Sequence, residues 1–403
     1  MDTAFIGKNI AALRKKAKMT QLELAKNLGV SDKAVSKWEN GHGYPDITVL
    51  PDLAALFGVS IDYIMLGEKK GIAIAGNMLV DIIKNIEAYP NAGMLSYVDN
   101  ISQAVGGCVP NTAINLSKID SRIPIKVFGK VGTDENGRYL ISKLQKYGID
   151  ASGISYSSKT ATSFSDVMSM PSGERTFFHK KGANVEFSPD DINFDKLNAS
   201  IFHIGYILLL DTFDNKDEKY GTVMAGFLHD VQKRGIKTSV DVVSSSNPDE
   251  YKEKVIPALK YCDYAFMNEI ECCSVEGVEP RKEDGSLHIE NIKNTMRKMA
   301  DYGVKEKIIV HSKERAIVLD VKTEKFTEVS SLKIPKEEIK GSVGAGDAFC
   351  AGCLYGLYNN FSDNQLLEFA SAAAACNLFE ANSIDGMKSR NEIIKVAEKY
   401  GRL

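Results

Sequence analysis

The feature that most constrains the fold is a series of short apolar runs, separated by helical patterns, that begins after residue 70. Strands that are apolar on both faces and alternate with helices are typical of a mostly parallel sheet covered by helices on both sides. Residues 72–403 are therefore predicted to form one α/β domain. A further pattern around a Pro/Gly turn predicts an antiparallel hairpin over residues 161–182 as a small β appendage. The six apolar runs of strand length cover residues 71–77, 125–132, 200–209, 236–243, 264–268 and 306–312.

The first 67 residues show helical patterns only. After an amphipathic first helix, Thr20 and Glu23 have the spacing of a capping box for a second helix, which is expected to end at Gly29. Ser31 is placed to cap a third helix that directs Val35 inward with Trp38. Two more helical segments, over residues 46–57 and 61–66, complete a five-helix unit. The second helix is expected to bury Leu22, Leu24, Ala25 and Leu28.

Charge is distributed unevenly between the two parts of the chain. Residues 1–70 contain ten Lys and Arg against eight Asp and Glu, a net charge of +2, and the remainder carries −5. Residues 68–71 form a charged break that we interpret as a linker between a domain over 1–67 and a domain over 72–403. The basic N-terminal part, residues 1–70, which we call the head, is joined to an acidic remainder. This distribution favours a polyanion partner for the head alone. A helix, a short glycine turn and a capped helix form the helix-turn-helix arrangement, which places its second helix in the DNA major groove.

The segment TQLELAKNLGVSDKAVSKWENG (20–41) resembles the DNA-binding domains of the Xre/Cro phage-repressor family, and the resemblance covers residues 6–67. It implies that the head binds double-stranded DNA. Lys and Ser can donate to base edges, and an Asp can accept from cytosine. The alternative is a helical protein-interaction module with a basic face. The resemblance implies phosphate contacts from Gln21 and Asn40, and base contacts from Asp32, Lys33, Ser36 and Lys37.

A glycine-rich turn at 341–347, GSVGAGD, leads into an apolar helix and is the most informative ligand-site candidate. The backbone N–H groups of Gly344, Ala345 and Gly346 can approach an anion at the start of that helix. Asp347 would then stand beside the anion, in a position to accept a proton from a hydroxyl that attacks phosphorus. On these residues alone, an ordinary early-helix acid explains Asp347 equally well.

The segment GAGDAFCAG resembles the C-terminal signature of the ribokinase-like (PfkB) carbohydrate kinase family. Four further segments match motifs of that family in the right order, and the resemblance spans about residues 71–390. It implies a ribokinase-like fold with a small β lid and phosphoryl transfer from ATP to a sugar hydroxyl. The four segments are Gly106-Gly107 with Asn111, VGTDENG at 131–137, residues 173–184, and Asn268 with Glu271.

The resemblance also implies roles for individual residues. Asp81, which follows the first strand, would hold sugar hydroxyls, although an ordinary loop acid remains the alternative. Gly106 and Gly107 would let the backbone approach the sugar, and Asn111 would hydrogen-bond it. Asn268 and Glu271 would support Mg²⁺ and phosphate through water, whereas the alternative for Glu271 is a plain surface helix residue.

Three departures from the family pattern bear on the cofactors. Gly341 and Ser342 stand where family members usually carry Asp-Thr, which puts a monovalent-cation site in doubt. The loop after the strand at 306–312 lacks the usual glycines, so either the adenine site is narrower or Lys313 reaches the phosphates. After Asp241, the strand at 236–243 continues with Val-Val-Ser-Ser-Ser and lacks the Asn and Arg common in sugar kinases.

Other features limit the remaining function classes. The chain contains no apolar run long enough for a membrane span and no signal-peptide pattern, so no membrane partner is expected. Seven cysteines, an odd number, favour reduced thiols in a cytoplasmic protein. Cys350 and Cys353 form a CxxC, but no second cysteine or histidine pair completes a zinc site, and the histidines show no metal-ligand spacing. Two classes remain: a working sugar kinase tethered to a DNA-binding head, and a transcription regulator whose kinase fold is a sensor without turnover. A nucleoside kinase is the alternative within the first class, and the family favours a homodimer.

Overall fold

The computed structural model describes residues 3–67, 70–171 and 174–403. Its contacts divide the chain into two compact units, Met1–Lys70 and Gly71–Leu403. Residues 68 and 69 of the proposed linker, and the turn residues 172 and 173 of the expected hairpin, lie outside the described residues. Among the described residues, no helix combines the length and the apolar character that a bilayer crossing requires.

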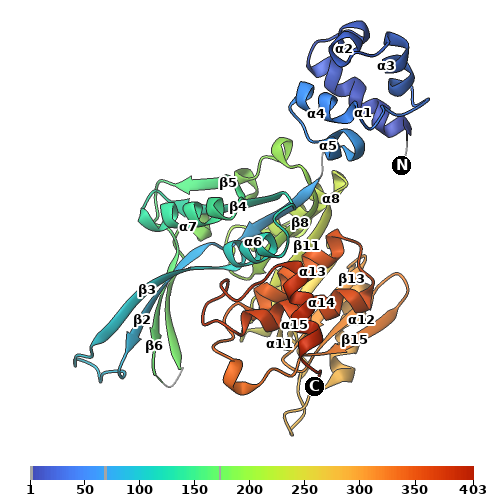
Figure 1. Ribbon diagram of the computed structural model, residues 1–403. Helices are drawn as coiled ribbons and strands as arrows, with labels where there is room; N and C mark the ends of the chain where they lie inside the picture. Colours follow the sequence, from blue (N-terminus) through green and yellow to red (C-terminus); the bar gives the residue numbers. More distant parts are fainter. Residues whose placement is uncertain (1–2, 68–69, 172–173) are drawn as a thin grey trace. The chain divides into compact units, whose positions relative to one another are not determined.

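Over residues 3–67, the N-terminal unit forms five helices around a small apolar core (Figure 1). Thr20 Oγ1 accepts from the Glu23 N–H, and the Glu23 carboxylate accepts from the Thr20 N–H at 2.7 Å, so the expected capping box is formed. The Ser31 hydroxyl caps the third helix by accepting from the Ala34 N–H. The helices are α1 (Thr3–Lys16), α2 (Gln21–Leu28), α3 (Asp32–Glu39), α4 (Leu50–Phe57) and α5 (Ile61–Leu66).

One expectation for the core of this unit is wrong. Leu22 is 53% exposed, whereas Leu24 and Ala25 of the same helix are buried, and Leu28 is half-buried. An α-helix turns 100° per residue, so Leu22 lies on the side of α2 opposite to Leu24 and cannot share its buried face. Trp38 of α3 is buried, as expected.

The second unit is built on a nine-stranded sheet in the order β15-β14-β13-β12-β11-β8-β1-β4-β5. Neighbouring strands from β13 to β5 are parallel, and β14 and β15 add an antiparallel edge. The six apolar runs identified in the sequence correspond to β1, β4, β8, β11, β12 and β13, which confirms the α/β prediction. The strands are β1 (Gly71–Gly76), β4 (Ile125–Gly132), β5 (Asp150–Ser157), β8 (Ala199–Ile207), β11 (Lys237–Val242), β12 (Tyr264–Asn268), β13 (Lys307–His311), β14 (Arg315–Asp320) and β15 (Lys325–Ser330).

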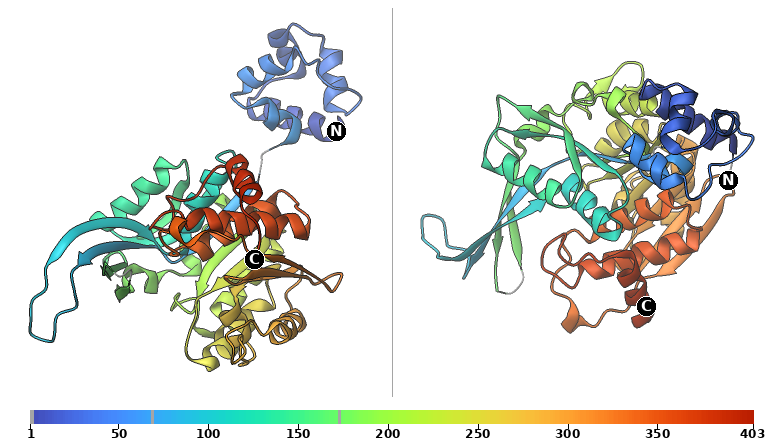
Figure 2. Two further views of the ribbon diagram at one scale, coloured as in Figure 1. Left: turned by 60° about the horizontal axis from the view of Figure 1, so that its bottom comes forward. Right: turned by 45° about the horizontal axis from the view of Figure 1, so that its top comes forward.

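Helices cover both faces of this sheet (Figures 1 and 2). On β1, Ile72 and Ile74 pack into one apolar cluster, while the alternate residues Ala73 and Ala75 pack into the other. The first cluster includes α6 (Cys108–Ile119), α7 (Glu135–Lys146), α13 (Ala345–Tyr358), α14 (Asp363–Asn377) and α15 (Arg390–Lys399). The second cluster includes α8 (Val223–Lys233), α10 (Ile256–Leu259), α11 (Glu269–Ser274) and α12 (Ile289–Tyr302). Three short elements lie between strands β8 and β12 in the sequence: β9 (Lys216–Asp217), β10 (Gly221–Thr222) and α9 (Pro248–Glu250).

A separate four-stranded sheet, in the order β3-β2-β6-β7, extends away from the main sheet (Figure 2), and we call it the lid. The antiparallel pair β6 (Phe164–Ser169) and β7 (Arg175–Lys180) is the expected hairpin. The pair β2 (Leu79–Ile86) and β3 (Val98–Gly106) was not foreseen, and it moves Asp81 from the expected loop onto a strand. Residues 98–103 of β3 are exposed and largely polar, so the apolar run that would reveal a buried strand is missing.

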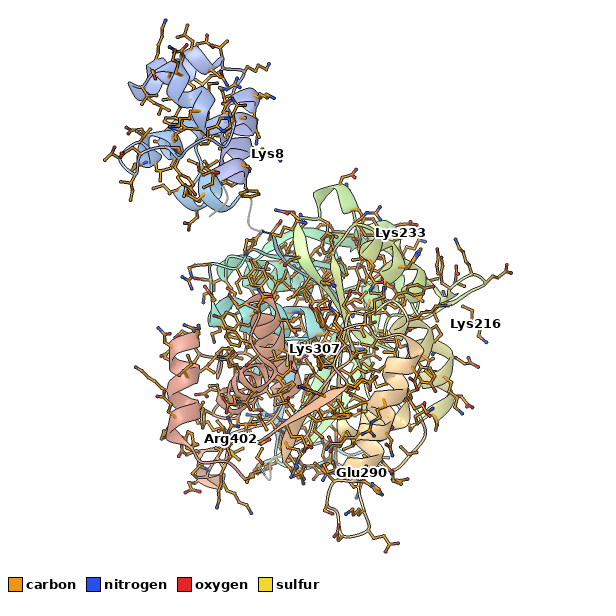
Figure 3. The ribbon with its side chains drawn as sticks, turned by 90° about the vertical axis from the view of Figure 1, so that its right-hand side faces the viewer. Lys8, Lys216, Lys233, Glu290, Lys307 and Arg402 are labelled. Atoms are coloured by element: carbon orange, nitrogen blue, oxygen red, sulfur yellow. The ribbon has the colours of Figure 1, made fainter. Side chains whose placement is uncertain are left out.

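Ion pairs and hydrogen bonds of Lys307 and Arg402, both labelled in Figure 3, hold the antiparallel edge to the rest of the domain. Lys307, at the start of β13, pairs with Asp320 at 2.7 Å and with Asp363 of α14 at 2.6 Å. Arg402, near the C-terminus, donates to the Ser330 carbonyl of β15 at 2.6 Å. The lysine therefore joins two strands and a helix, and the arginine fixes the end of the chain on the sheet edge.

Candidate active site

Asp347 lies in the first turn of α13 and is buried. Gly344 caps this helix with φ +77°, a left-handed conformation that favours glycine. A Cβ at Gly344 would also lie 2.3 Å from the Ser383 Cβ, so the turn has no room for a side chain. The Ala345 N–H, expected to contact an anion with those of Gly344 and Gly346, donates instead to the Ser342 carbonyl at 3.2 Å, within the turn. The N–H groups of Gly346 and Asp347 belong to the first helical turn, whose donors have no acceptor inside a helix.

Two side chains from distant parts of the chain hold the Asp347 carboxylate. Asn111 Nδ2 donates to Asp347 Oδ2 at 2.9 Å, and the Tyr206 hydroxyl donates to the same carboxylate at 3.2 Å. The Ser383 hydroxyl donates to Asn111 Oδ1 at 2.7 Å and so orients the amide. Asn111, expected to bond a sugar, here positions the carboxylate.

The electrostatic surroundings favour the protonated form of Asp347. Burial, together with the nearby carboxylates of Asp241 and Asp81, raises the pKa of Asp347 to about 7, against the lowering effect of the bonds from Asn111 and Tyr206. Catalytic bases work best when their pKa lies near the working pH, because they then exist as the base and still bind the proton. Asp347 has this property.

The lid contributes Asp81 to the same region. A Cβ at Gly106 would lie 2.6 Å from Asp81 Oδ2, which explains the glycine, and Gly107 is the N-cap residue of α6. Burial raises the pKa of Asp81 to about 6, while the positive charge of Arg175 on β7 opposes the rise. Asp81, the glycine pair and Asn111 of α6 are therefore brought together beside Asp347.

A cavity of about 230 Å³ is lined in part by Asp347. Gly344, Gly346 and Asp347 line it from the turn, and Asn268 and Glu271 line it from the end of β12 and the start of α11. The structure thus brings together the glycine turn and the Asn268–Glu271 motif, two groups far apart in the sequence.

Asn268 and Glu271 also have a local structural role. Asn268 caps α11 by accepting from the Glu271 N–H at 2.8 Å, and Glu271 Oε2 accepts from the Asn268 N–H at 2.8 Å. Glu271 Oε1 accepts from the Ser244 hydroxyl at 2.9 Å. Burial, with Asp241 and Glu269 nearby, raises the pKa of Glu271 to about 7. A cation in the cavity would relieve this cost, and oxygen donors are what Mg²⁺ prefers, so the residues fit that ion.

A second cavity, of about 260 Å³, adjoins the first. Gly346, His311 and Phe349 line both cavities, so the start of α13 lies between them. The His311 ring lies 4.7 Å from the Phe349 ring, and burial lowers the pKa of His311 to about 4. Lys313 lines the second cavity, but its side chain is 80% exposed.

Sequence reasoning missed Tyr206, Ser383 and Asp241 as parts of the site. Tyr206 has φ +64°, rare for a residue with a side chain, and strained backbone of this kind clusters at functional sites. No local pattern marks Tyr206 or Ser383. Asp241 was detectable in principle, because it lies near the carboxyl end of β11, where ligand sites of parallel sheets lie. Its Oδ1 accepts from the Tyr206 N–H at 2.6 Å.

Five of the six residues proposed to contact DNA lie on α3 or at its C-cap, and the sixth, Gln21, begins α2. Asp32, Lys33 and Lys37 are exposed, and Ser36 is half-buried. The Asn40 amide, although exposed, donates to the Ser36 carbonyl at 2.9 Å. Gln21, at the start of α2, is half-buried and donates to Glu39 at 2.8 Å; Glu39 also pairs with Arg14 at 2.7 Å.

Comparison with known proteins matches each of the two parts of the chain to a family model. The family model "pfkB family carbohydrate kinase" matches residues 69–390, and the model "Helix-turn-helix" matches residues 10–64. A 5-dehydro-2-deoxygluconokinase of Geobacillus kaustophilus is 23% identical over 334 residues, which cover 81% of this chain and 92% of that protein. The Probable fructokinase-4 of Arabidopsis thaliana is 31% identical over 147 residues, or 36% of this chain and 43% of that protein.

Solved structures show the same fold. The Arabidopsis thaliana ribokinase complexed with ribose and ATP has a TM-score of 0.67 at 21% identity and matches 82% of this chain and 99% of its own. The Thermotoga maritima ribokinase has a TM-score of 0.65 at 18% identity, with 81% and 99% coverage. The family match extends over most of the chain and includes the glycine turn, Asp347, the lid and both cavities. The chain therefore belongs to the pfkB family of carbohydrate kinases and carries a helix-turn-helix segment at its N-terminal end.

Proposed function

We propose that this protein transfers the γ-phosphoryl group of ATP to a hydroxyl of a sugar or sugar-like substrate, with Asp347 as general base. One observation carries the proposal: a buried carboxylate with a pKa of about 7 stands at the start of α13, where two cavities and the lid residue Asp81 meet. In the step, Asp347 takes the hydroxyl proton while the oxygen bonds to the γ-phosphorus, and the bond to the β-phosphate oxygen breaks to release ADP. The N–H groups of Gly344 and Gly346, predicted for this role, together with that of Asp347, would stabilise charge on the transferred group.

In this proposal the phosphates occupy the 230 Å³ cavity and the nucleoside occupies the 260 Å³ cavity, with Lys313 at its rim. Asn268 and Glu271 would hold Mg²⁺ through water, and the ion would neutralise charge on the phosphates. Gly341 offers no carboxylate for a monovalent-cation site, so potassium dependence is not part of the proposal.

The substrate is proposed to bind between Asp81 and Asp347. Asp81 can accept from paired hydroxyls, and Arg175 lies close enough to influence its pKa, so the lid offers both an acceptor and a cation. This pair suits a sugar acid, the substrate class in the name of the Geobacillus relative, as well as a neutral ketose.

The test is ADP release by the purified full chain with ATP, Mg²⁺ and a panel of ketoses, aldoses, keto sugar acids and nucleosides. Turnover of a sugar or sugar acid that disappears in Asp347→Asn supports the proposal. Turnover of nucleosides alone would replace it by the nucleoside-kinase alternative. Sugar binding without ADP release in the wild-type protein would favour a sensor. The Tyr206 hydroxyl that donates to Asp347 must move aside or bond the substrate during turnover, and a sensor would keep this hydroxyl in place.

We also propose that the helix-turn-helix unit binds double-stranded DNA through α3, which implies a cytoplasmic regulator. Binding of the full chain to an operator-containing duplex should weaken steeply with salt, because each neutralised phosphate releases counterions. Lys33→Ala should relax sequence preference, and Gln21→Ala should weaken all sites alike. Lys8→Ala is the matched control, because it removes the same charge at an exposed position of α1. Salt-independent affinity would overturn this proposal.

The two functions are proposed to be coupled through a homodimer. The lid exposes Tyr97 and Ile101 at its β3 edge and Phe177 and Phe178 at its β7 edge, apolar surface that a second copy would cover. Substrate under the lid would then change operator affinity, and operator DNA would change substrate affinity by the same factor. Operator isotherms with and without sugar test this, with Asp81→Ala as the control that cannot hold sugar. Identical isotherms at saturating sugar would rule out the coupling.

A further inference from the structure

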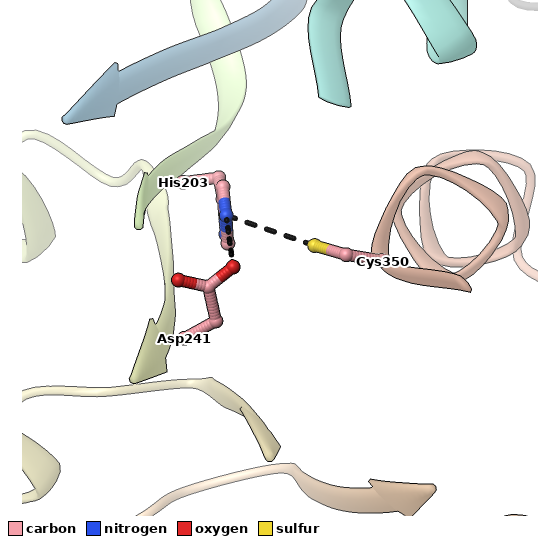
Figure 4. Close-up of side chains that lie close together, drawn as sticks. All are labelled: His203, Asp241 and Cys350. Carbon is pink, nitrogen blue, oxygen red and sulfur yellow. Dashed lines mark hydrogen bonds and ion pairs between the residues drawn. The ribbon is translucent and has the colours of Figure 1, made fainter. Parts of the chain in front are cut away.

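His203, Asp241 and Cys350 converge beside the catalytic cavity from three separate elements (Figure 4). His203 lies on β8, Asp241 on β11 and Cys350 on α13. The Cys350 Sγ lies 3.6 Å from His203 Nε2, and His203 Nε2 lies 3.5 Å from Asp241 Oδ2. All three candidate ligand atoms lie within 4.8 Å of one another. Neither the hydroxyl-to-ATP transfer nor the Mg²⁺ contacts proposed above use His203 or Cys350.

Two of the three separations match those of a tetrahedral metal site. With Zn²⁺–ligand distances of about 2.0–2.3 Å, two ligand atoms of a tetrahedron lie roughly 3.3–3.8 Å apart. The separations of His203 Nε2 from Cys350 Sγ and from Asp241 Oδ2, 3.6 and 3.5 Å, fall inside that range, and the Cys350 and Asp241 atoms lie within 4.8 Å of each other. An ion could therefore bind with small adjustments of the Cys350 and Asp241 side chains.

Neighbouring groups orient the ligand atoms. His203 Nδ1 lies 2.8 Å from the Ser239 hydroxyl, a bond that directs the opposite ring nitrogen, Nε2, toward Cys350 and Asp241. The Tyr206 N–H occupies Asp241 Oδ1, which leaves Oδ2 on the side of His203. A histidine held through its second nitrogen and a carboxylate held through its second oxygen are the usual outer contacts of metal ligands.

Burial and access also suit an ion. His203 has no exposed surface, and Cys350 is only 3% exposed, so water does not compete from outside at these ligands. Asp241 and Cys350 both line the 230 Å³ cavity, which provides an entry path and space for a fourth ligand. Three protein ligands with an open fourth position are the pattern of a zinc site that retains a water.

We propose that His203, Asp241 and Cys350 bind a transition-metal ion of the Zn²⁺ class, distinct from the Mg²⁺ that the kinase reaction needs. The ligand set decides the class of ion: a thiolate and an imidazole suit Zn²⁺ and Co²⁺, whereas Mg²⁺ takes oxygen ligands. The fourth ligand would be a water or a phosphate oxygen in the cavity. The proposal does not depend on turnover, since the site uses two residues outside the phosphoryl-transfer chemistry.

The test titrates metal-free full-length protein with Co²⁺ alone, in the absence of nucleotide and sugar, and follows the absorption from thiolate-to-cobalt charge transfer. We expect one Co²⁺ per chain with that absorption, and its loss when Zn²⁺ is added, because Zn²⁺ binds more tightly than Co²⁺ to such ligands. Cys353→Ser is the matched control: Cys353 is buried in the same helix, one turn away, and is not part of the cluster. Cys350→Ser should abolish the absorption, and His203→Gln should lower the affinity at least about 10-fold.

A second measurement keeps the result interpretable if a variant is unstable. Zn²⁺ should raise the Tm of the wild-type protein and of Cys353→Ser, and leave that of Cys350→Ser unchanged. Ser239→Ala keeps all three ligands and removes the contact that orients His203, so the Co²⁺ affinity should fall about 10–100-fold. Absence of the charge-transfer absorption in the wild-type protein, or its persistence in Cys350→Ser, would overturn the proposal and leave a thiol–imidazole hydrogen bond only.

Discussion

The N-terminal helical unit and the catalytic region of the kinase unit are built from different kinds of contact. In the helical unit, the capping box joins Thr20 to Glu23, three residues apart, and Gly29 ends the same helix. In the catalytic region, Asp347 is held by Asn111 and Tyr206, which are 236 and 141 residues away in the sequence. Local contacts form wherever the short segment folds, whereas the catalytic contacts exist only when the whole sheet is assembled. The two regions should therefore respond differently to matched substitutions.

The largest effect is expected at the residue whose environment depends most on tertiary structure. Asp347→Asn should lower kcat about 10²–10⁴-fold, the usual contribution of a general base, while sugar and ATP binding stay within a few-fold. The amide oxygen can still accept from Asn111, so the fold is retained. Steady-state kinetics and calorimetric binding measure both quantities. Unchanged kcat would remove Asp347 from the catalytic role.

The same substitution should stabilise the kinase unit in a pH-dependent way. The folded state holds the Asp347 pKa near 7 instead of its ordinary 3.8, so the wild-type carboxyl costs folding free energy once the pH exceeds about 4. The advantage of Asp347→Asn should be about 1.5 kcal/mol at pH 5 and grow to at most about 4 kcal/mol above pH 7. Denaturant unfolding at pH 5.5 and pH 8 measures it. A larger advantage at pH 5.5 than at pH 8 would contradict the assigned direction.

Two glycines with similar backbone conformations allow a direct comparison of the regions. Gly344 has φ +77° and would place a Cβ 2.3 Å from Ser383, whereas Gly29 has φ +65° and no neighbour within 4 Å of a Cβ. Gly344→Ala should cost roughly 2–4 kcal/mol, because backbone strain and a steric clash add, and it should lower kcat as the turn shifts.

Gly29→Ala should cost only about 1 kcal/mol, from backbone strain alone, and leave kinase turnover unchanged. Thermal unfolding and kinetics of the two variants decide the comparison. Equal costs at the two positions would show that the contact with Ser383 adds nothing.

The smallest effect is expected for a purely local contact. Thr20→Ala removes the hydroxyl that accepts from the Glu23 N–H and should destabilise the helical unit by about 1 kcal/mol. Hydrogen exchange should become faster in α2 and remain unchanged in α13. Leu22→Ala is the control: Leu22 is on the same helix but exposed, so its loss should change stability little. A faster exchange in α13 would reveal coupling between the units.

Much of the fold follows from the sequence because its signals are short-range. Apolar runs of strand length marked six strands of the main sheet, and the caps at Thr20 and Ser31 marked two helix starts. The β2–β3 pair of the lid escaped this reasoning, since residues 98–103 face solvent and carry no apolar alternation. The burial of Leu22 was predicted wrongly, because the prediction used its apolar character and not its position around the helix.

The sequence by itself determined the two-part organisation, the glycine turn before Asp347 and the residue types that a kinase site requires. Tertiary structure decided which of these meet. It placed Asp81 on a lid strand, set Asn111 and Tyr206 on the Asp347 carboxylate, and closed His203, Asp241 and Cys350 into one cluster. The physical reason is that sequence patterns record the burial and backbone geometry of neighbouring residues. The order of strands in the sheet sets contacts, electric fields and pKa values between residues hundreds of positions apart.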